Sequence, residues 1–277
     1  MAADWPKGYD VAEDSTSPDQ RFALVIPGRD TLGNDDEEKV NYLADVKAHH
    51  LLGKIHGADY TWGENHRGLN VWWSSDSARV LLDYEGRYGF DQLMVLEPRP
   101  DGFAQSDLSK FVHGALNAAI ARQPHGKDLD CFGEVFCRWT PDGKLRLRVL
   151  GQTNPKQLET SPTYSASFQG TYDPKARKWT AVESHPVNDL YDELGALFRT
   201  PNFANRSYNR EEDRADALDH ELNDTYQALK SILPADRFAQ VKKDQIAWLK
   251  TRDAAATTKA KCELLEARIK ALQELAW

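Results

Sequence analysis

The sequence contains little sulfur and no long hydrophobic run, and these absences limit what the protein can be. Its 277 residues include three cysteines and two methionines. No apolar run approaches the ~20 residues of a membrane-spanning helix, so we expect no membrane span. The start, Met1-Ala2-Ala3-Asp4, has neither the charged nor the apolar region of a secretory leader. The protein is therefore either cytoplasmic or a mature protein in which an initiator methionine replaces a removed leader.

Common catalytic and phosphate-binding motifs are also missing. The sequence has no G-x-S-x-G, no H-E-x-x-H and no glycine-rich phosphate loop. No spacing of cysteines and histidines matches a zinc site. His50 and His56 would lie ~20 Å apart in one strand, too far to share an ion. We therefore expect no metal, no cofactor and no enzyme activity.

Positive charge is scarce in the first part of the chain. Residues 206–277 hold 13 of the 35 basic and 13 of the 43 acidic residues, which leaves 22 basic and 30 acidic residues before them. The first part therefore carries the whole net charge of −8. Such a surface does not suit DNA or RNA, because phosphate binding needs a basic face. It suits a basic partner, or it serves solubility alone.

Length and composition indicate a globular protein with two domains. Hydrophobic residues make up 40% and charged residues 28% of the chain, the balance of a water-soluble protein. At roughly 150 residues per domain, the length suggests two domains. Residues 1–187 have the pattern of an antiparallel sheet domain with one long helix, and residues 188–277 that of a helical module. The predicted fold class is α+β.

Runs rich in β-branched, aromatic and leucine residues, bounded by turn residues, predict the strands. These runs are 22–26, 42–46, 51–55, 69–73, 80–84, 93–96, 132–139, 145–150, 163–171 and 179–183. Helical spacing predicts one helix from Ser106 to Ile120. Asp-containing turns recur at Ser17, Ser74, Thr140 and Tyr172, at intervals of 57, 66 and 32 residues. These uneven intervals favour independent turns over a β-propeller repeat.

Helical periodicity dominates after residue 188. It predicts a short helix over 189–198, a long one over 209–233 and a last one from Asp236 to Leu275. Pro234 separates the two long helices, which then form an antiparallel hairpin. The 189–198 helix or the sheet domain must cover the rest of the apolar stripe of this hairpin.

The hairpin carries a recognisable residue pattern. The first helix holds Leu222-Asn223, Tyr226 and Leu229, and the second holds Gln245, Trp248 and Arg252-Asp253. This resembles the L-N-x-x-Y-x-x-L … Q-x-x-W-x-x-x-R-D pattern of LprI-type lysozyme-inhibitor-like domains, over about residues 209–277. The resemblance implies a lysozyme as partner and a periplasmic or secreted location. Family members usually carry a cysteine after the Arg-Asp pair, where this chain has Ala254-Ala255-Ala256.

We interpret this motif as mainly structural. Gln245, Trp248 and Arg252 share one helix face, because they lie three and four residues apart. Trp248 is predicted to pack against the stripe that contains Tyr226. The Arg252-Asp253 pair is predicted to lock the hairpin through charge-assisted hydrogen bonds, with Asn223 or the Tyr226 hydroxyl as partner.

Two loops and two cysteines are further candidate sites. The polar loop Gly63–Gly68 offers Glu64, Asn65, His66 and Arg67 for binding, or Glu64 and His66 as a general acid–base pair. The acidic loop Asp35-Asp36-Glu37-Glu38 would steer a basic partner. Cys131 and Cys137 can form a disulfide only if the chain turns between them, and Gly133 permits such a turn. We predict this bond for an oxidising compartment.

The leading interpretation is a non-enzymatic cell-envelope protein that binds another protein. The resemblance points to a lysozyme, inhibited by occlusion of its cleft. One alternative is an enzyme or a small-ligand binder that uses the 63–68 loop. Another is a helical module that only braces the sheet domain. The sequence does not define the oligomeric state.

Overall fold

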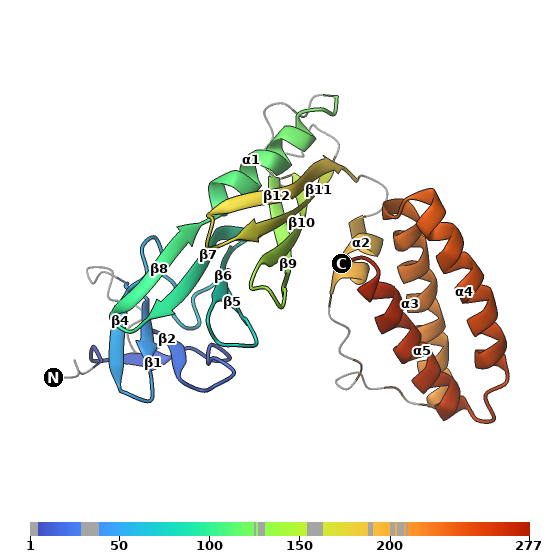
Figure 1. Cartoon of the computed structure of the whole chain (residues 1–277), viewed down its shortest axis with the longest axis horizontal. Helices are drawn as coiled ribbons and strands as arrows, with labels where there is room; N and C mark the ends of the chain where they lie inside the picture. The colour runs from blue at the N-terminus through green and yellow to red at the C-terminus, as the bar shows by residue number, and fades with distance from the viewer. Residues whose placement is uncertain are drawn as a thin grey trace. The chain divides into compact units, whose positions relative to one another are not determined.

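The computed structural model describes residues 5–28, 39–124, 126, 131–153, 163–187, 191–199, 203, 208 and 210–277. The chain divides into two compact units, Met1–Val187 and Asn188–Trp277. Strands and one long helix make up the described part of the first unit, and helices make up the second (Figure 1). The predicted α+β class with a helical C-terminal module is confirmed.

The described part of the sheet unit contains three four-stranded antiparallel sheets, where the sequence predicted one sheet domain without dividing it. The first holds β1 (Tyr9–Val11), β2 (Phe22–Pro27), β3 (Tyr42–Asp45) and β4 (His50–Lys54). The second holds β5 (Gly68–Trp73), β6 (Val80–Gly86), β7 (Gly89–Arg99) and β8 (Gly102–Asp107). The third holds β9 (Cys131–Trp139), β10 (Leu145–Thr153), β11 (Ser165–Asp173) and β12 (Lys178–Pro186). Strands adjacent in sequence pair in every sheet, and β1 and β8 were missed by the prediction.

The central strands of the second sheet, β6 and β7, are buried on both faces, which explains the long apolar run in β6. In β6, Val80, Leu82 and Tyr84 pack with residues of the first sheet, whereas Leu81 packs with residues of the third. Side chains alternate between the two faces of a strand, so a strand covered on both sides needs apolar residues at consecutive positions. The run Val80-Leu81-Leu82 therefore places this sheet in the middle of a stack.

The Asp-containing turns occupy equivalent places in the three sheets. Each of the first three joins the first strand of a sheet to the second, and a Ser or Thr hydroxyl donates to the Asp: Ser17 to Asp19 at 2.6 Å, Ser74 to Asp76 at 2.6 Å and Thr140 to Asp142 at 2.5 Å. The fourth residue of each turn has a left-handed backbone: Gln20, Ser77 and Gly143. The first three turns therefore mark a structural repeat, which corrects their interpretation as independent turns. The fourth turn, at Tyr172, joins β11 to β12 within the third sheet and lies outside the repeat. Unequal connections between the sheets, including the helix before β9, make the intervals of 57 and 66 residues uneven.

A tryptophan before each later turn bonds its sheet to the preceding one. The indole N–H of Trp73 donates to the Ser15 carbonyl at 2.8 Å, and that of Trp139 donates to the Trp72 carbonyl at 2.8 Å. Both acceptors lie two residues before the turn of the preceding sheet. The same bond therefore occurs at both junctions between sheets.

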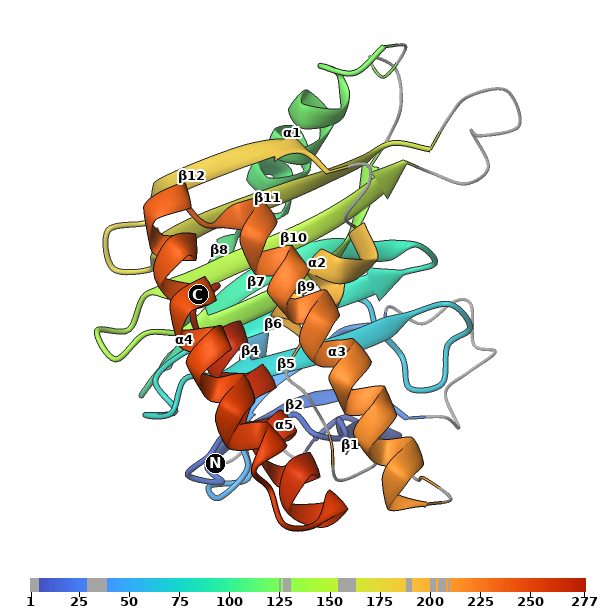
Figure 2. The same cartoon turned by 90° about the vertical axis from the view of Figure 1, so that its right-hand side faces the viewer.

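Helix α1 (Ser109–Ile120) covers part of the third sheet, as Figures 1 and 2 show. Its buried side chains, Val112, Leu116, Ala119 and Ile120, join the core cluster that contains Phe168 and Leu147. The sequence predicted this helix, but its start at Ser106 is wrong, because Ser106 and Asp107 belong to β8. The Ser109 N–H donates to Asp107 Oδ1 at 2.8 Å, so Asp107 supports the first turn of the helix.

The two-helix hairpin predicted for the second unit is wrong in one respect. The unit holds α2 (Tyr191–Phe198), α3 (Glu211–Ile232), α4 (Ala235–Asp253) and α5 (Thr258–Glu274), so the last predicted helix is two helices. The alanine run at 254–256 has high helix propensity and conceals the break. Thr257 then caps α5 by accepting a hydrogen bond from the Ala260 N–H at 3.1 Å.

Helix α5 runs along α3, and α2 closes one side of the pair (Figures 1 and 2). Leu265 and Ile269 of α5 are fully buried, as are Ala228 and Leu229 of α3. Gln273 donates through Nε2 to the Ala196 carbonyl at 2.8 Å, which ties α5 to α2. Within the described residues, no helix is both long and apolar enough to cross a bilayer.

The predicted disulfide between Cys131 and Cys137 does not form. Strand β9 runs from Cys131 to Trp139 in continuous register with β10, without the turn at Gly133 that the bond requires. All three cysteines are free thiols. A straight strand separates residues six apart by ~20 Å, beyond the reach of a disulfide. Cys131 instead packs in the core between the second and third sheets.

Candidate functional site

The polar loop Gly63–Gly68 is held by ion pairs and does not form an acid–base pair. Glu64 Oε1 lies 3.6 Å from Lys39 Nζ, and Arg67 Nη2 lies 2.5 Å from Asp59 Oδ1. His66 is exposed, with a left-handed backbone at φ 60°. Asn65 is exposed as well. The loop therefore resembles a braced surface turn more than a catalytic pair.

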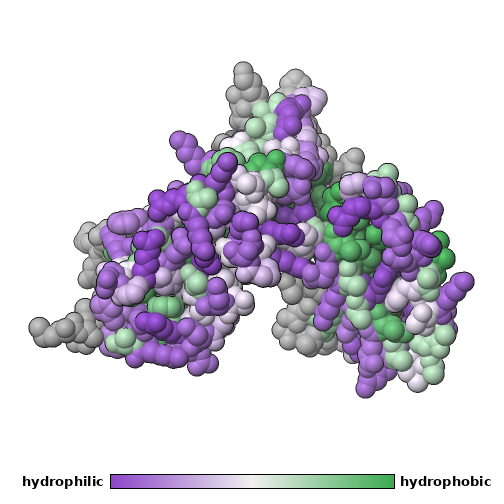
Figure 3. Space-filling view, viewed as in Figure 1, coloured by the Kyte–Doolittle hydropathy of each residue, from purple (hydrophilic) through white to green (hydrophobic). Residues whose placement is uncertain are grey.

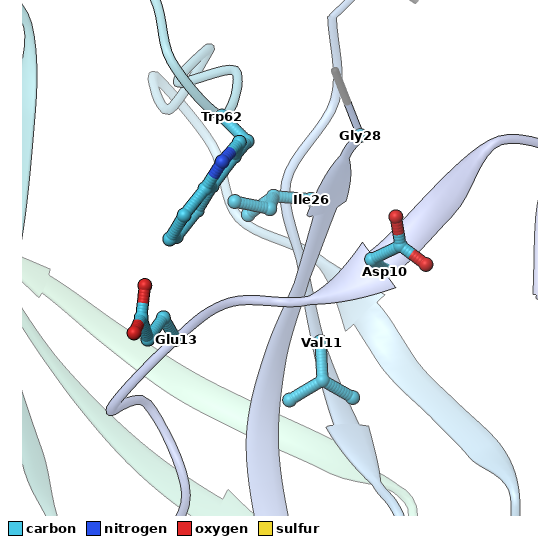
Figure 4. A pocket seen from close by; sticks show the side chains of 6 residues that line it. All are labelled: Asp10, Val11, Glu13, Ile26, Gly28 and Trp62. Carbon is cyan, nitrogen blue, oxygen red and sulfur yellow. The ribbon is translucent and has the colours of Figure 1, made fainter. Parts of the chain in front are cut away.

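A pocket lies immediately before this loop, next to Trp62. It has a volume of about 280 Å³ and is lined by Asp10, Val11, Glu13, Ile26, Gly28 and Trp62. In Figure 4 the Glu13 carboxylate lies beyond one end of the Trp62 indole and Ile26 lies beside the indole, whereas the Asp10 carboxylate and the Val11 side chain point away from both. We call this cavity the Trp62 pocket. Neither Glu64 nor His66 is among the residues that line it.

The Trp62 pocket adjoins a second cavity through two shared residues. The second cavity has a volume of about 320 Å³ and also contains Glu13 and Trp62 in its wall. Its other lining residues are Asp14 and the β5 residues Leu69, Asn70, Val71 and Trp72. The two cavities therefore follow the first strands of the first and second sheets, β1 and β5.

A buried carboxyl group lies behind the wall of the second cavity. Asn70 donates through Nδ2 to Asp83 Oδ2 at 3.2 Å, and Asp83 is 1% exposed. Burial, reinforced by the charge of Glu85, raises the pKa of Asp83 to about 8. Asp83 therefore holds its proton at neutral pH and adds no charge to the wall.

In the helical unit, the motif residues divide into buried and surface positions. Leu222 and Leu229 are 2% and 0% exposed, so they belong to the core. Gln245, Trp248 and Arg252 are half-buried on α4. Asn223 and Asp253 are exposed. The motif therefore supplies both packing and surface polar groups.

Asp219 joins α3 to both of the following helices. Its Oδ1 lies 2.8 Å from Arg252 Nη1 of α4, and its Oδ2 lies 2.8 Å from Lys261 Nζ of α5. Arg252 also contacts the neighbouring Asp253 at 2.8 Å. Arg252 thus locks the helices together as the sequence predicted, but its partner on α3 is Asp219, where Asn223 or Tyr226 was predicted.

The predicted packing of Trp248 against the Tyr226 stripe is also corrected. The Tyr226 ring packs against Phe238, with centroids 5.0 Å apart. Trp248 has the guanidinium groups of Arg252 and Arg268 at 6.0 Å and 5.8 Å from its ring. Arg268 also donates to Gln245 Oε1 at 2.8 Å. The break between α4 and α5 explains the difference, because it brings Arg268 back to the Trp248 face.

The acidic segment Asp35–Glu38 lies outside the residues that the structure describes. Sequence reasoning missed the Trp62 pocket and Asp219. Trp62 precedes the glycine of the predicted loop, and Glu13 and Asp14 follow a strand of three residues, so the only available signal was one aromatic beside a turn. Asp219 lies seven residues before Tyr226, outside the motif that drew attention to α3.

Comparison with known proteins shows a similarity that is confined to the helical unit. Residues 207–274 match the family model described as Lysozyme inhibitor LprI, which confirms the resemblance drawn from the motif. None of the curated proteins compared with the chain is similar to it. Among solved structures, the Pseudomonas aeruginosa periplasmic gluconolactonase PpgL aligns at 13% identity over 62% of this chain. The alignment spans 53% of that chain with a TM-score of 0.23, which establishes no common fold.

Proposed function

We propose that this protein is a non-enzymatic cell-envelope protein that binds a lysozyme and inhibits it by occluding its cleft. The observation that carries the proposal is the match of residues 207–274 to the Lysozyme inhibitor LprI family, on the helices that hold its motif. A periplasmic or secreted location belongs to the same proposal, because a lysozyme acts on the cell wall.

The distribution of charge supports a basic partner. The net charge of −8 resides in the chain before residue 206, and the view in Figure 3 shows a largely hydrophilic surface on the sheet unit. An acidic surface accelerates the encounter with a basic protein. We assign the Asp35–Glu38 segment to this steering.

Contact with the hydrolase is assigned to exposed side chains of the helical unit. The buried motif residues Leu222 and Leu229 hold α3 in the bundle and are not available to a partner. Asn223 and Asp253 belong to the same motif and are exposed. They are therefore the motif positions that a bound protein would reach.

The alternative function, which uses the 63–68 loop, is narrowed to ligand binding without catalysis. Glu64 pairs with Lys39 and His66 points to solvent, so the loop offers no assembled acid–base pair. Arg67 is likewise engaged by Asp59. The neighbouring Trp62 pocket favours ligand binding over chemistry.

Inhibition is tested by the lysis of bacterial cell walls with a basic lysozyme. We expect the full chain to slow lysis at tens of micromolar, on the order of the weak end of useful affinities. An unrelated acidic protein of similar net charge is the control, because a basic enzyme adheres to many anionic surfaces. Lysis that is no slower than in the control rejects the inhibitor function.

Steering is tested separately, through the association rate. Replacing Asp35, Asp36, Glu37 and Glu38 by Asn and Gln should lower the on-rate and leave the off-rate nearly unchanged. The difference from the unaltered chain should vanish in 1 M salt, where the Debye length is ~3 Å. If the variant associates more slowly by the same factor at low and at high salt, its effect is not electrostatic and the steering proposal fails. The proposal of inhibition is not affected by that result.

A further inference from the structure

Helix α4 has an outer face that carries positive charge around one exposed apolar side chain. Ile246 is 54% exposed. Lys242, Lys243 and Lys250 are also exposed, and they lie four residues before, three residues before and four residues after Ile246. Residues three and four apart share one face of a helix, so these side chains form a single surface. We call Lys242, Lys243, Ile246 and Lys250 the Lys–Ile stripe.

The lysines of the stripe are not neutralised by neighbouring carboxylates. Within the described part of the chain, Lys242, Lys243 and Lys250 take part in no ion pair or hydrogen bond. Arg252, on another side of the same helix, pairs with Asp219 of α3 at 2.8 Å. The stripe therefore presents uncompensated positive charge to solvent, whereas the charge that faces α3 is compensated.

The charges of the helical unit are separated between its helices. Helix α3 holds seven acidic and two basic residues, whereas α4 holds five basic and three acidic residues. The acidic residues of α4 are Asp236 and Asp253 near its two ends and Asp244, which accepts a hydrogen bond from Gln240 at 2.7 Å. Helix α4 packs on one side of the α3–α5 pair (Figures 1 and 2). The unit is therefore positive along the outer face of α4, between the two ends of that helix.

We propose that the Lys–Ile stripe is the surface that enters the cleft of the hydrolase, where its lysines meet the catalytic carboxyl groups. This inference rests on the proposed function. A glycosidase cleaves its substrate between two carboxyl groups, which lie roughly 5–5.5 Å apart in a retaining enzyme such as lysozyme. A cleft concentrates the field of the charges that line it, so it is locally negative even in a basic enzyme. A lysine ammonium group is complementary to such a cleft.

The shape of the stripe also suits a cleft. A helix with its side chains is a convex rod about 10–12 Å across. Ile246 lies between Lys243 and Lys250, which are about 10.5 Å apart along the helix axis at a rise of 1.5 Å per residue. An apolar centre with a polar rim is the arrangement that concentrates binding energy in protein interfaces. Ile246 would pack on the apolar wall of the cleft while the lysines reach its carboxyl groups.

The sign of the lysine effect separates the cleft from the rest of the enzyme. The net charge of a basic lysozyme repels lysines, so a stripe that touched only the outer surface of the enzyme would bind better without them. Lysines that pair with the carboxyl groups of the cleft have the opposite effect, because binding weakens when they are removed. Weaker inhibition after the loss of positive charge is therefore specific to the cleft.

Lysis of bacterial cell walls by a basic lysozyme, measured with the full chain, tests the stripe. The double variant Lys243→Gln/Lys250→Gln should raise the concentration that halves lysis about tenfold, and Ile246→Gln should raise it by a similar factor. All three positions are exposed, so the core of the unit stays intact. The double variant Lys230→Gln/Lys259→Gln is the matched control, because it removes two exposed lysines from α3 and α5. The control should not weaken inhibition.

Competition for the cleft is tested with the unaltered chain. Its dissociation constant with the lysozyme is measured by calorimetry, with and without a saturating N-acetylglucosamine trisaccharide, a substrate fragment that occupies the cleft. The trisaccharide should weaken binding at least about tenfold. Binding that the trisaccharide leaves unchanged would place the contact outside the cleft and overturn the inference.

The results distinguish this inference from the proposed function. If the unaltered chain does not slow lysis, the proposed function fails and the inference fails with it. If the unaltered chain slows lysis and the stripe variants inhibit as well as the matched control does, inhibition stands and the stripe is excluded. Weaker self-association of the stripe variants in sedimentation, with undiminished inhibition, would assign the stripe to a second copy of the chain and overturn the inference.

Discussion

The stacked sheets and helix α4 are stabilised by different interactions. The central strands of the middle sheet, β6 and β7, are buried on both faces by apolar side chains, and the indole hydrogen bonds of Trp73 and Trp139 join this sheet to its neighbours. Helix α4 has 19 residues, of which only Val241 is buried. Its other contacts include the Arg252–Asp219 ion pair and the cationic groups around Trp248. The sheets should therefore resist salt, whereas the attachment of α4 should not.

The largest expected effect is the loss of a core aromatic from the sheet unit. Phe168 is 1% exposed and packs edge-to-face on Trp179, with centroids 5.4 Å apart. Phe168→Ala should cost about 3–5 kcal/mol in the free energy of unfolding, measured by urea denaturation. Phe111 stacks on the same indole but is 45% exposed, so Phe111→Ala should cost far less. Equal losses in the two variants would contradict the assigned core.

The next effect concerns the proton on Asp83. Burial raises its pKa in the folded state to about 8, above its value in the unfolded chain, so the folded state binds more protons between pH ~4 and ~8. The stability from this group is complete below pH ~4 and is lost as pH rises toward 8, by about 1.4 kcal/mol per pH unit.

Asp83→Asn keeps the shape and removes the titration. Urea unfolding between pH 6 and 8 should show a smaller fall in stability for this variant than for the unaltered chain. Asp101→Asn, at an exposed turn, should leave the pH dependence as it was. An unchanged slope in Asp83→Asn would show that this carboxyl is not the titrating group.

A smaller effect should follow removal of the ion-pair centre of the helical unit. Asp219 is 27% exposed and contacts Arg252 and Lys261, so Asp219→Asn should cost about 1 kcal/mol at low salt. Hydrogen exchange should accelerate in α4 and not in the sheets. Asp224→Asn on the same helix is the control, since Asp224 is exposed and without an ion pair in the described structure. A cost that persists in 1 M salt would contradict the electrostatic origin.

The smallest effect is expected for Trp248. Its ring is half-buried between Arg252 and Arg268, so Trp248→Ala should cost about 1 kcal/mol, the range of a partly exposed cation–π contact. If Trp248 instead packed on Tyr226, as predicted from the sequence, the same substitution would cost ~3–5 kcal/mol. Urea unfolding measures the loss of stability, and hydrogen exchange of the α4 amides shows whether the loss arises in that helix. A loss above ~3 kcal/mol would support the packing on Tyr226 that the sequence predicted.

The fold was more predictable from the sequence than the site was. Apolar runs located most of the strands, because a buried strand needs apolar residues wherever it is covered. The stacking of three sheets could not be predicted, since the bonds of Trp73 and Trp139 link residues 58 and 67 positions apart. The break after α4 was hidden by the helix propensity of its alanines. The Trp62 pocket needs β1, the end of β2 and Trp62 to lie close together, and that proximity exists only in the folded chain.

The repeated indole bond also has a consequence for how the sheets lose structure. Because each sheet bonds mainly to its immediate neighbours, the stack behaves as a short linear array with nearest-neighbour coupling. An outer member of such an array has one interface to lose, whereas the inner member must lose two. The amides of β6 and β7 should consequently exchange last. The first sheet can fray while the other two persist, and the Trp62 pocket, built partly on that sheet, would then disappear before the core does.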